Sequence, residues 1–478
     1  MESETQPKQV GDAKSHSSKV SVSSSISEAS TIAYEHEPFE KFQHKVADVV
    51  AKHFHCDLSR IKVTHLKGGA YNRVAAVSIA HRPKKLGLSW LIAAVPVAQC
   101  LGARWKTQSL DADSYIVRIP RGTGEDEDFD VNFEVAALKA ADAHVALPTP
   151  EVVSYDLTSN NAIGKSYMIQ KRIPGQNLSL MLGELNWDQK MCMAKRVAEL
   201  ASKIAAVEGP ADAISVATLS SPSGLLQIEK FRLPKFTACE DRPLDQPVTW
   251  PTQVRKPVEY LLEYCERWRQ YHKSEDEDVA FHEFWDAFVV ISKSLDKRGF
   301  LEGPCVLVHG DLKQYNILAE IRSETEVEIT GIIDWDSAVM APEFMAYPAP
   351  FWLWISQEKN VDSCVEDEES MANLSPSTDE GKMVKQIFID NASEKYKLHA
   401  FAPESMLARR MFCVLQHGIF GPWFYKEAED VIDEWNELHP EDGVQPLEKF
   451  EPKLYNGVEG HESVEALEQD SDDSDDSE

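Results

Sequence analysis

The chain has 478 residues, a hydrophobic content of 43% and a formal net charge of −30 at pH 7. This length exceeds that of one ordinary domain and predicts two lobes, and the hydrophobic content is sufficient for a substantial core. The acidic balance excludes the basic surface that nucleic acid requires, so we expect no nucleic-acid partner.

The two ends of the chain are polar. Residues 1–35 contain ten serines, and residues 459–478 are rich in Glu, Asp and Ser, so we expect both ends to be disordered. The eight cysteines form no C-x-x-C pair, and the uncharged run 88–103 is too short to cross a membrane. With no signal peptide evident, we expect a cytoplasmic protein with reduced thiols and no membrane partner.

The first folded segment begins with residues 38–54, where apolar residues recur near helical spacing and predict an amphipathic helix. Two β-like runs follow within 61–77, and Gly68, Gly69 and Asn72 lie between them or at the start of the second. A glycine turn brings backbone N–H groups close to phosphate oxygens, because no Cβ intervenes. Taken alone, the fragment is more typical of an ordinary β-hairpin, and the phosphate-binding interpretation depends on the later motif.

A cation and a carboxylate follow on neighbouring elements. Residues 114–120 alternate as a strand does, with Arg118 near the centre, and residues 130–143 have the pattern of a helix that carries Glu134. A strand cation paired with a helix carboxylate can hold a phosphate-binding group in place. The alternative is a pair of surface charges that contribute little.

Two further strands, 152–155 and 167–171, precede Pro174-Gly175, which we interpret as a hinge between lobes. Beyond it the periodicity becomes helical. Helices are expected after a capping box at Asn186 and over 257–272, 279–297, 383–396 and 405–438, with long loops over 210–256 and an acidic loop over 362–380.

The most informative stretch is an apolar run that ends in a His-Gly-Asp turn. Asp311 is followed five positions later by Asn316 and, 18 positions after that, by Asp334 at the end of a β-branched run. Phosphoryl transfer needs a carboxylate that orients and deprotonates the attacking hydroxyl, and further oxygen ligands that hold magnesium on the phosphates. The pattern predicts Asp311 as the base and Asn316 and Asp334 as the magnesium ligands. The alternative, turn and capping residues, does not explain the fixed spacing between apolar runs.

With these motifs in this order, residues 38–440 resemble the aminoglycoside phosphotransferase family, most closely its large fungal branch. The resemblance implies an α+β, protein-kinase-like fold: an N-terminal antiparallel-sheet lobe (36–172) that binds ATP with Mg²⁺, and a mostly helical C-terminal lobe (173–458) that binds the acceptor. The residues that the resemblance assigns to the nucleotide are Gly68, Gly69 and Asn72 over the phosphates, Arg118 with its partner Glu134 on the phosphates, and Gln170, Lys171 and Arg172 beside the adenine.

The chain departs from the family pattern in two places. Arg118 replaces the usual Lys, which keeps the charge but changes the reach and the donor geometry, and the glycine turn lacks a full G-x-G-x-x-G. Protein kinases share the fold, but they carry Arg where this chain has Gly310. Only a short segment separates Asp334 from Ala341-Pro342-Glu343, which leaves no room for the long activation loop of a protein kinase.

We therefore predict a kinase that transfers the γ-phosphoryl group of ATP to the hydroxyl of a small molecule. The acceptor is expected to be cationic, because a net charge of −18 remains when residues 441–478, which carry −12, are set aside. The alternative is a kinase-shaped pseudoenzyme that binds a partner and transfers nothing. The sequence identifies neither the acceptor nor any protein partner.

Overall fold

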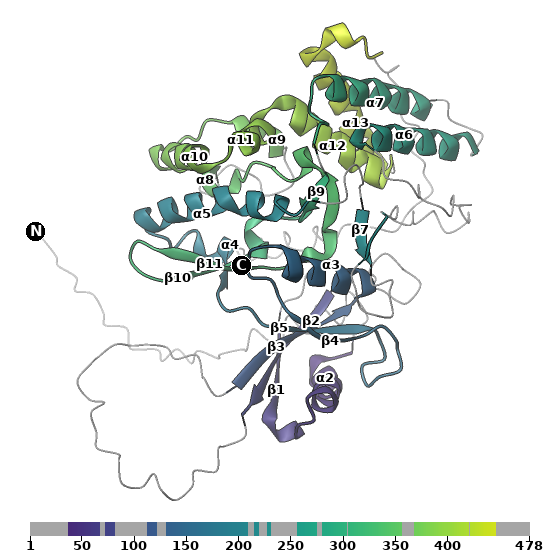
Figure 1. Ribbon diagram of the computed structural model, residues 1–478. Coiled ribbons are helices and arrows are strands. Elements are labelled where there is room, and N and C mark those ends of the chain that lie inside the picture. Colours follow the sequence, from purple (N-terminus) through teal and green to yellow (C-terminus); the bar gives the residue numbers. More distant parts are fainter. Residues whose placement is uncertain are drawn as a thin grey trace, which may run out of the picture.

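Two lobes make up the protein, one built on a sheet and one mainly helical (Figure 1). The predicted fold class is confirmed, because the N-terminal strands form one antiparallel sheet and most of the later elements are helices. Gly68, Gly69, most of the stretch between the second and third strands, and both expected tails lie outside the described residues. The computed structural model describes residues 37–66, 72–81, 112–121, 131–208, 215–218, 227–230, 256–274, 280–303, 305–355, 368–419 and 421–445.

The elements follow the chain in the order expected for an N-terminal sheet and a later helical lobe. The helices are α2 (Phe39–Phe54), α3 (Val131–His144), α4 (Leu178–Met181), α5 (Trp187–Ala205), α6 (Pro257–Ser274), α7 (Ala280–Lys297), α8 (Trp352–Ile355), α9 (Glu368–Asn373), α10 (Asp379–Asn391), α11 (Glu394–Phe401), α12 (Pro403–His417) and α13 (Gly421–Leu438). The strands are β1 (Ile61–His65), β2 (Asn72–Ala80), β3 (Ala112–Pro120), β4 (Val152–Asp156), β5 (Tyr167–Lys171), β6 (Gln176–Asn177), β7 (Ser215–Thr218), β8 (Gln227–Lys230), β9 (Cys305–Val308), β10 (Ile317–Ile321), β11 (Val327–Ile332) and β12 (Val339–Pro342).

The N-terminal sheet has the strand order β1-β2-β3-β5-β4, with every neighbouring pair antiparallel. Val117 and Ile119 of β3 belong to the small core that this sheet forms with α2. Side chains alternate between the two faces of a strand, so Arg118 projects from the opposite face. On that face its register partner Met168 belongs to the larger core, which the C-terminal lobe shares. Alternation in β3 therefore directs Arg118 toward the C-terminal lobe.

The C-terminal lobe is built on a large aromatic core. The indole rings of Trp268 in α6 and Trp285 in α7 stack with centroids 5.5 Å apart, and Trp268 Nε1 donates to Leu415 O in α12 at 2.9 Å. The predicted capping box begins α5: Asn186 and Gln189 exchange side-chain to backbone hydrogen bonds of 3.0 Å. The described aromatic side chains of α6 and α7 recur at helical spacing and are part of this core.

Three short strand pairings position the loops that carry the polar motif. β10 and β11 form an antiparallel hairpin in which Ile317 lies opposite Ile332, and β6, which follows Pro174-Gly175, pairs with β10. β12 pairs with β9, so that Val339 lies opposite Val308. The residues after β9 and those before β12 are thereby brought side by side.

The structure differs from two expectations about loops. Residues 215–218 and 227–230, expected to be loop, form the strands β7 and β8, because β7 extends the small sheet by pairing with β12. The stretch expected to be an acidic loop contains α9 and the start of α10, where Thr378 caps the helix. No helix among the described residues combines the length and apolar character needed to cross a membrane.

Candidate active site

Gly310 allows two loops to approach each other closely. Its φ is +81°, a left-handed conformation that glycine adopts without strain, and a Cβ at this position would lie 2.2 Å from Ser337 O. The loop after β9 and the loop before β12 are therefore in direct backbone contact. A side chain at residue 310 would force them apart.

His309 is buried between the same two loops. Its Nδ1 accepts a hydrogen bond from Asp311 N at 3.3 Å, and its Nε2 donates to Ile333 O at 3.0 Å. Its ring packs against that of Trp335, with centroids 4.7 Å apart. Burial lowers the pKa of His309 to about 4, so the imidazole is neutral at pH 7. His309 is a structural bridge that fixes Asp311 relative to the segment around Asp334.

Asp311 has a hydrogen-bond donor on each carboxylate oxygen. Tyr315 Oη donates to Oδ1 and Asn316 Nδ2 donates to Oδ2, each at 2.9 Å, and Asn316 Nδ2 also bonds the backbone oxygen of Asp311 at 2.9 Å. Burial and the neighbouring Asp311 raise the pKa of Tyr315, so the phenol retains its proton. The carboxylate is about one-third exposed and is held in one orientation.

Asn316 and Asp334 lie at the same open end of the β10–β11 hairpin. Ile333 N donates to Asn316 O at 3.0 Å, which joins the residue before β10 to the residue after β11. Asp334 adopts φ +67°, ψ +60°, a left-handed conformation that Asp tolerates better than most residues. Both hydrogen bonds of the Asn316 side chain use its nitrogen, so its amide oxygen can still ligate a cation.

The oxygen donors at this hairpin end fit magnesium, which proteins usually hold through one or two carboxylates together with phosphate oxygens. The described residues contain no group of three or more His, Cys, Asp or Glu that could hold a metal by themselves. A cation here would therefore take further ligands from a bound phosphate or from water.

Arg118 faces the hairpin end from the N-terminal lobe. Its Nη2 forms ion pairs with Asp334 Oδ1 at 2.9 Å and with Asp336, while its Nε lies 3.7 Å from Glu134 Oε2. Burial alone would lower the pKa of Arg118, but the three carboxylates raise it above its ordinary value. The predicted partner Glu134 is present, although the closest contacts of Arg118 are to Asp334 and Asp336.

Asn72 completes this interlobe cluster. Its Nδ2 donates to Glu134 Oε1 at 3.0 Å and to Asp336 Oδ2 at 3.2 Å, so the amide joins β2 to both α3 and the C-terminal lobe. Burial raises the pKa of Asp336, while Arg118 opposes that change. Asp336 follows Asp334 by two positions, but nothing in the sequence indicated its contacts with the N-terminal lobe.

The three residues expected beside the adenine do not point the same way. Gln170 is buried, and its Oε1 has no hydrogen-bond partner among the described residues. Lys171 instead forms an exposed ion pair with Glu151, and the Arg172 side chain is exposed. The structure thus brings Gln170 inward at the end of β5 and leaves the side chains of Lys171 and Arg172 on the surface.

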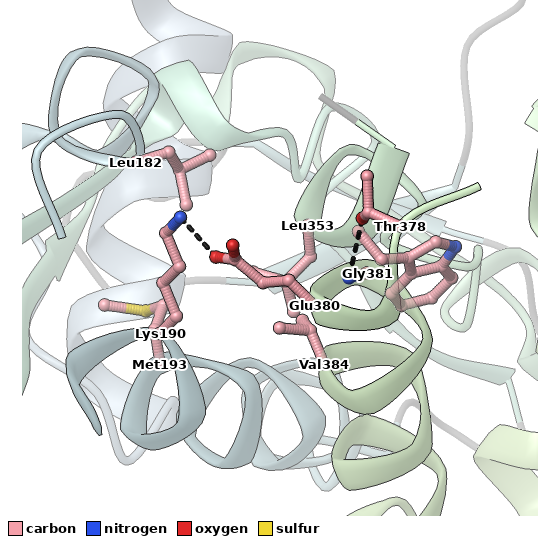
Figure 2. Close-up of a pocket in the computed structure, with 9 residues that line it drawn as sticks. Leu182, Lys190, Met193, Leu353, Thr378, Glu380, Gly381 and Val384 are labelled. Atoms are coloured by element: carbon pink, nitrogen blue, oxygen red, sulfur yellow. Dashed lines mark hydrogen bonds and ion pairs between the residues drawn. The ribbon is translucent and has the colours of Figure 1, made fainter. Parts of the chain in front are cut away.

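A separate pocket lies between α5 and α10 (Figure 2). The Lys190 ammonium forms an ion pair with Glu380 across it, and Thr378 Oγ1 accepts from Gly381 N at 3.0 Å. None of the predicted site residues lines this pocket. Its lining residues are Leu182, Lys190, Met193, Leu353, Trp354, Thr378, Glu380, Gly381 and Val384.

Comparison with protein families gives a match over residues 101–345 to the model described as the phosphotransferase enzyme family. Among curated proteins, the chain is 33% identical over 89 residues to subtelomeric hrmA-associated cluster proteins from two strains of Aspergillus fumigatus. That match covers 19% of this chain and spans 18% of the length of each relative.

Several solved structures are similar at low identity. The ternary complex of the aminoglycoside phosphotransferase APH(4)-Ia with AMP-PNP and hygromycin B is 15% identical, with a TM-score of 0.41, and the alignment covers 81% of this chain and 98% of that one. The ADP-bound aminoglycoside phosphotransferase APH(2'')-Ib is 11% identical, with a TM-score of 0.43 and coverages of 81% and 96%. A GDP and kanamycin complex of another APH(2'') enzyme is 15% identical, with a TM-score of 0.38 and coverages of 84% and 98%.

Proposed function

The chain belongs to the phosphotransferase enzyme family, and from that premise we propose that it transfers the γ-phosphoryl group of ATP to a hydroxyl of a small-molecule acceptor. The observation that carries this proposal is the open end of the β10–β11 hairpin. There Asn316 shares a 2.9 Å hydrogen bond with Asp311, and its backbone oxygen accepts from the N–H of Ile333, the residue preceding Asp334. Arg118 faces this group from the other lobe.

Each side chain has a role in the proposed reaction. The acceptor oxygen forms a bond to the γ-phosphorus while the bond from that phosphorus to the bridging oxygen of ADP breaks, and ADP leaves with the electron pair. Asp311 orients the acceptor hydroxyl and takes its proton. Arg118 and Asn72, which face the hairpin end from the N-terminal lobe, would bind phosphate oxygens. Magnesium, held by Asn316 and Asp334, would neutralise charge on the phosphates.

The acceptor that we propose is small and cationic. The charge of −18 that remains outside residues 441–478 would concentrate such a molecule near the protein. The short connection from Asp334 to β12 also supports a small molecule rather than a protein as the acceptor, because that connection forms a compact turn packed against Gly310. The pseudoenzyme alternative is weakened because Asp311, Asn316 and Asp334 are all present and lie close together.

The test is a screen of the purified protein with ATP and magnesium against amino sugars, cationic amines and neutral sugars, with products followed by ³¹P NMR. Kanamycin and hygromycin B, bound in two of the solved structures above, are the first amino sugars to include. We expect transfer to at least one cationic acceptor and weaker transfer to neutral sugars of similar size. If no acceptor is phosphorylated and no magnesium-dependent ATP hydrolysis occurs, the pseudoenzyme interpretation is favoured.

Asp311→Asn is the control for this screen. It retains the size and part of the hydrogen bonding of the side chain but loses the proton acceptor, so turnover should fall by about 10²- to 10⁴-fold. ATP affinity and melting temperature should remain those of the parent. Turnover equal to that of the parent would show that Asp311 is not the base.

A further inference from the structure

Tyr315 is the residue of the Asp311 loop that the proposed roles do not use. Its phenol donates a 2.9 Å hydrogen bond to Asp311 Oδ1, yet 40% of the residue is exposed. Tyr315 is thus only partly exposed, and its hydroxyl contacts the proposed base directly. The hydrogen bond from Tyr315 to Asp311 therefore suggests that the phenol acts on the carboxylate.

Asn177, which follows Pro174-Gly175 in the chain, fixes the backbone of Tyr315. Asn177 Nδ2 donates to Tyr315 O at 2.6 Å, and Asn177 is itself held by the pairing of β6 with β10 and by accepting from Ser179 N at 2.8 Å. The 3-10 turn Gln314–Asn316 then directs the Tyr315 side chain back to Asp311. A chain of hydrogen bonds thus runs from the segment after the hinge to the proposed base.

The two oxygens of Asp311 are not equivalent. Oδ2 accepts from Asn316, which is assigned to magnesium, and we therefore assign Oδ1 to the acceptor. A carboxylate oxygen accepts two hydrogen bonds, and Tyr315 occupies one of these positions on Oδ1. Lys313 Nζ lies 3.9 Å from the same oxygen, beyond hydrogen-bond distance. The acceptor hydroxyl must therefore bind the other position, beside the phenol.

We propose that Tyr315 is a positioning residue: its hydroxyl holds the Asp311 carboxylate in the orientation for proton transfer and confines the acceptor hydroxyl to the remaining position on Oδ1. This inference rests on the proposed phosphotransferase function. It predicts an effect on the chemical step and none on nucleotide binding, because Tyr315 contacts the base and not the Arg118 cluster.

The test compares Tyr315→Phe with the parent in magnesium-dependent ATP hydrolysis, where water is the acceptor, and with any acceptor that the screen provides. The variant keeps the ring and loses one hydrogen bond to a charged group, so kcat should fall by about 10- to 100-fold. KM for ATP and the melting temperature should be unchanged. Tyr155→Phe is the matched control, because Tyr155 is similarly exposed, at 37%, on β4 of the other lobe.

A double-mutant cycle separates positioning from an independent role. If Tyr315 acts through Asp311, Tyr315→Phe should cost little further activity once Asp311→Asn is in place. An equal loss in both backgrounds, an unchanged kcat, or a raised KM for ATP would each overturn the proposal. A parent that neither hydrolyses ATP nor phosphorylates any acceptor would overturn the proposed function and this inference together. An active parent with an equally active Tyr315→Phe would overturn this inference alone.

Discussion

The guanidinium of Arg118 lies 2.9 Å from the carboxylate of Asp334, although 216 positions separate the two residues along the chain. The ion pair joins the N-terminal sheet to the open end of the β10–β11 hairpin. A guanidinium and a divalent cation both need carboxylate oxygens, so Arg118 and magnesium would compete for Asp334 until nucleotide phosphates supply ligands for both.

Arg118 is also expected to determine stability, because it neutralises buried carboxylates. Arg118→Met would leave the buried Glu134 and the partly buried Asp336 without a cation, and the free energy of unfolding in urea should fall by about 3–5 kcal/mol. Arg322→Met is the control, since Arg322 forms only exposed ion pairs with Glu320 and Glu328 and should cost about 1 kcal/mol or less. Equal losses in the two variants would show that the buried cluster contributes no more than a surface pair.

Asp334→Ala should remove the magnesium-dependent part of the rise in melting temperature that ATP produces. The reason is that ligand binding stabilises the folded state by an amount that rises with the logarithm of the affinity, and Asp334 is the carboxylate assigned to the metal. The measurement is thermal unfolding with ATP, with and without magnesium. Asp336→Ala serves as the comparison and should retain a magnesium-dependent increment. The reverse pattern would transfer the ligand role to Asp336.

Gly310→Ala should be far more damaging than Gly164→Ala. Both glycines have a left-handed φ, +81° and +79°, so each substitution should cost about 1–2 kcal/mol of conformational strain. A Cβ at residue 164 meets nothing within 4 Å, whereas one at residue 310 would strike the backbone of Ser337. We expect the additional loss of stability, measured in urea, and the loss of turnover only for Gly310→Ala. Similar behaviour of the two variants would contradict the close approach of the loops.

Stability should decline in mild acid because His309 is buried in its neutral form. Its pKa in the folded state is about 4, below the ordinary value of 6.5, so the unfolded chain takes up a proton that the folded protein does not. The free energy of unfolding should therefore fall as the pH is lowered from about 6.5 to about 4, by on the order of 1 kcal/mol per pH unit from this group.

His309→Asn should reduce this acid-dependent loss, which urea unfolding at several pH values would measure. His44→Asn, which removes an exposed histidine, is the control for the substitution itself. An identical pH dependence of the parent and His309→Asn would mean that His309 takes up its proton in the folded state as readily as in the unfolded chain.

Much of the fold follows from local patterns. The helix at residue 39, the strands that carry Arg118 and Gln170, and the capping box at Asn186 were all predicted, because apolar spacing and capping chemistry act over a few residues. The prediction of loop after residue 210 was wrong at β7, because β7 pairs with β12, which is far away in the chain. A short strand formed by a distant partner leaves little local signal.

The sequence predicted the motif residues of the candidate site but not the hydrogen bonds and ion pairs that connect them to the rest of the protein. The order of Asp311, Asn316 and Asp334 identified the hairpin end, whereas the roles of Asp336 and Tyr315 depend on which groups the fold places beside them. Side-chain alternation within β5 was a signal that the adenine assignment left unused, since adjacent strand residues project to opposite faces.

Pro174 and Gly175, the hinge predicted from the sequence, both contact the β10–β11 hairpin. Gly175 packs directly against Ala319 of β10, and Pro174 O accepts from Thr330 Oγ1 of β11 at 2.6 Å. Both residues are therefore tied to the hairpin, and we expect any rotation of the lobes to pivot before Pro174. Such a rotation would carry Arg118 away from Asp334 while the spacing of Asp311 and Asn316 stayed constant. Nucleotide exchange would then be a motion that opens the phosphate contacts and leaves the proton-transfer geometry assembled throughout the cycle.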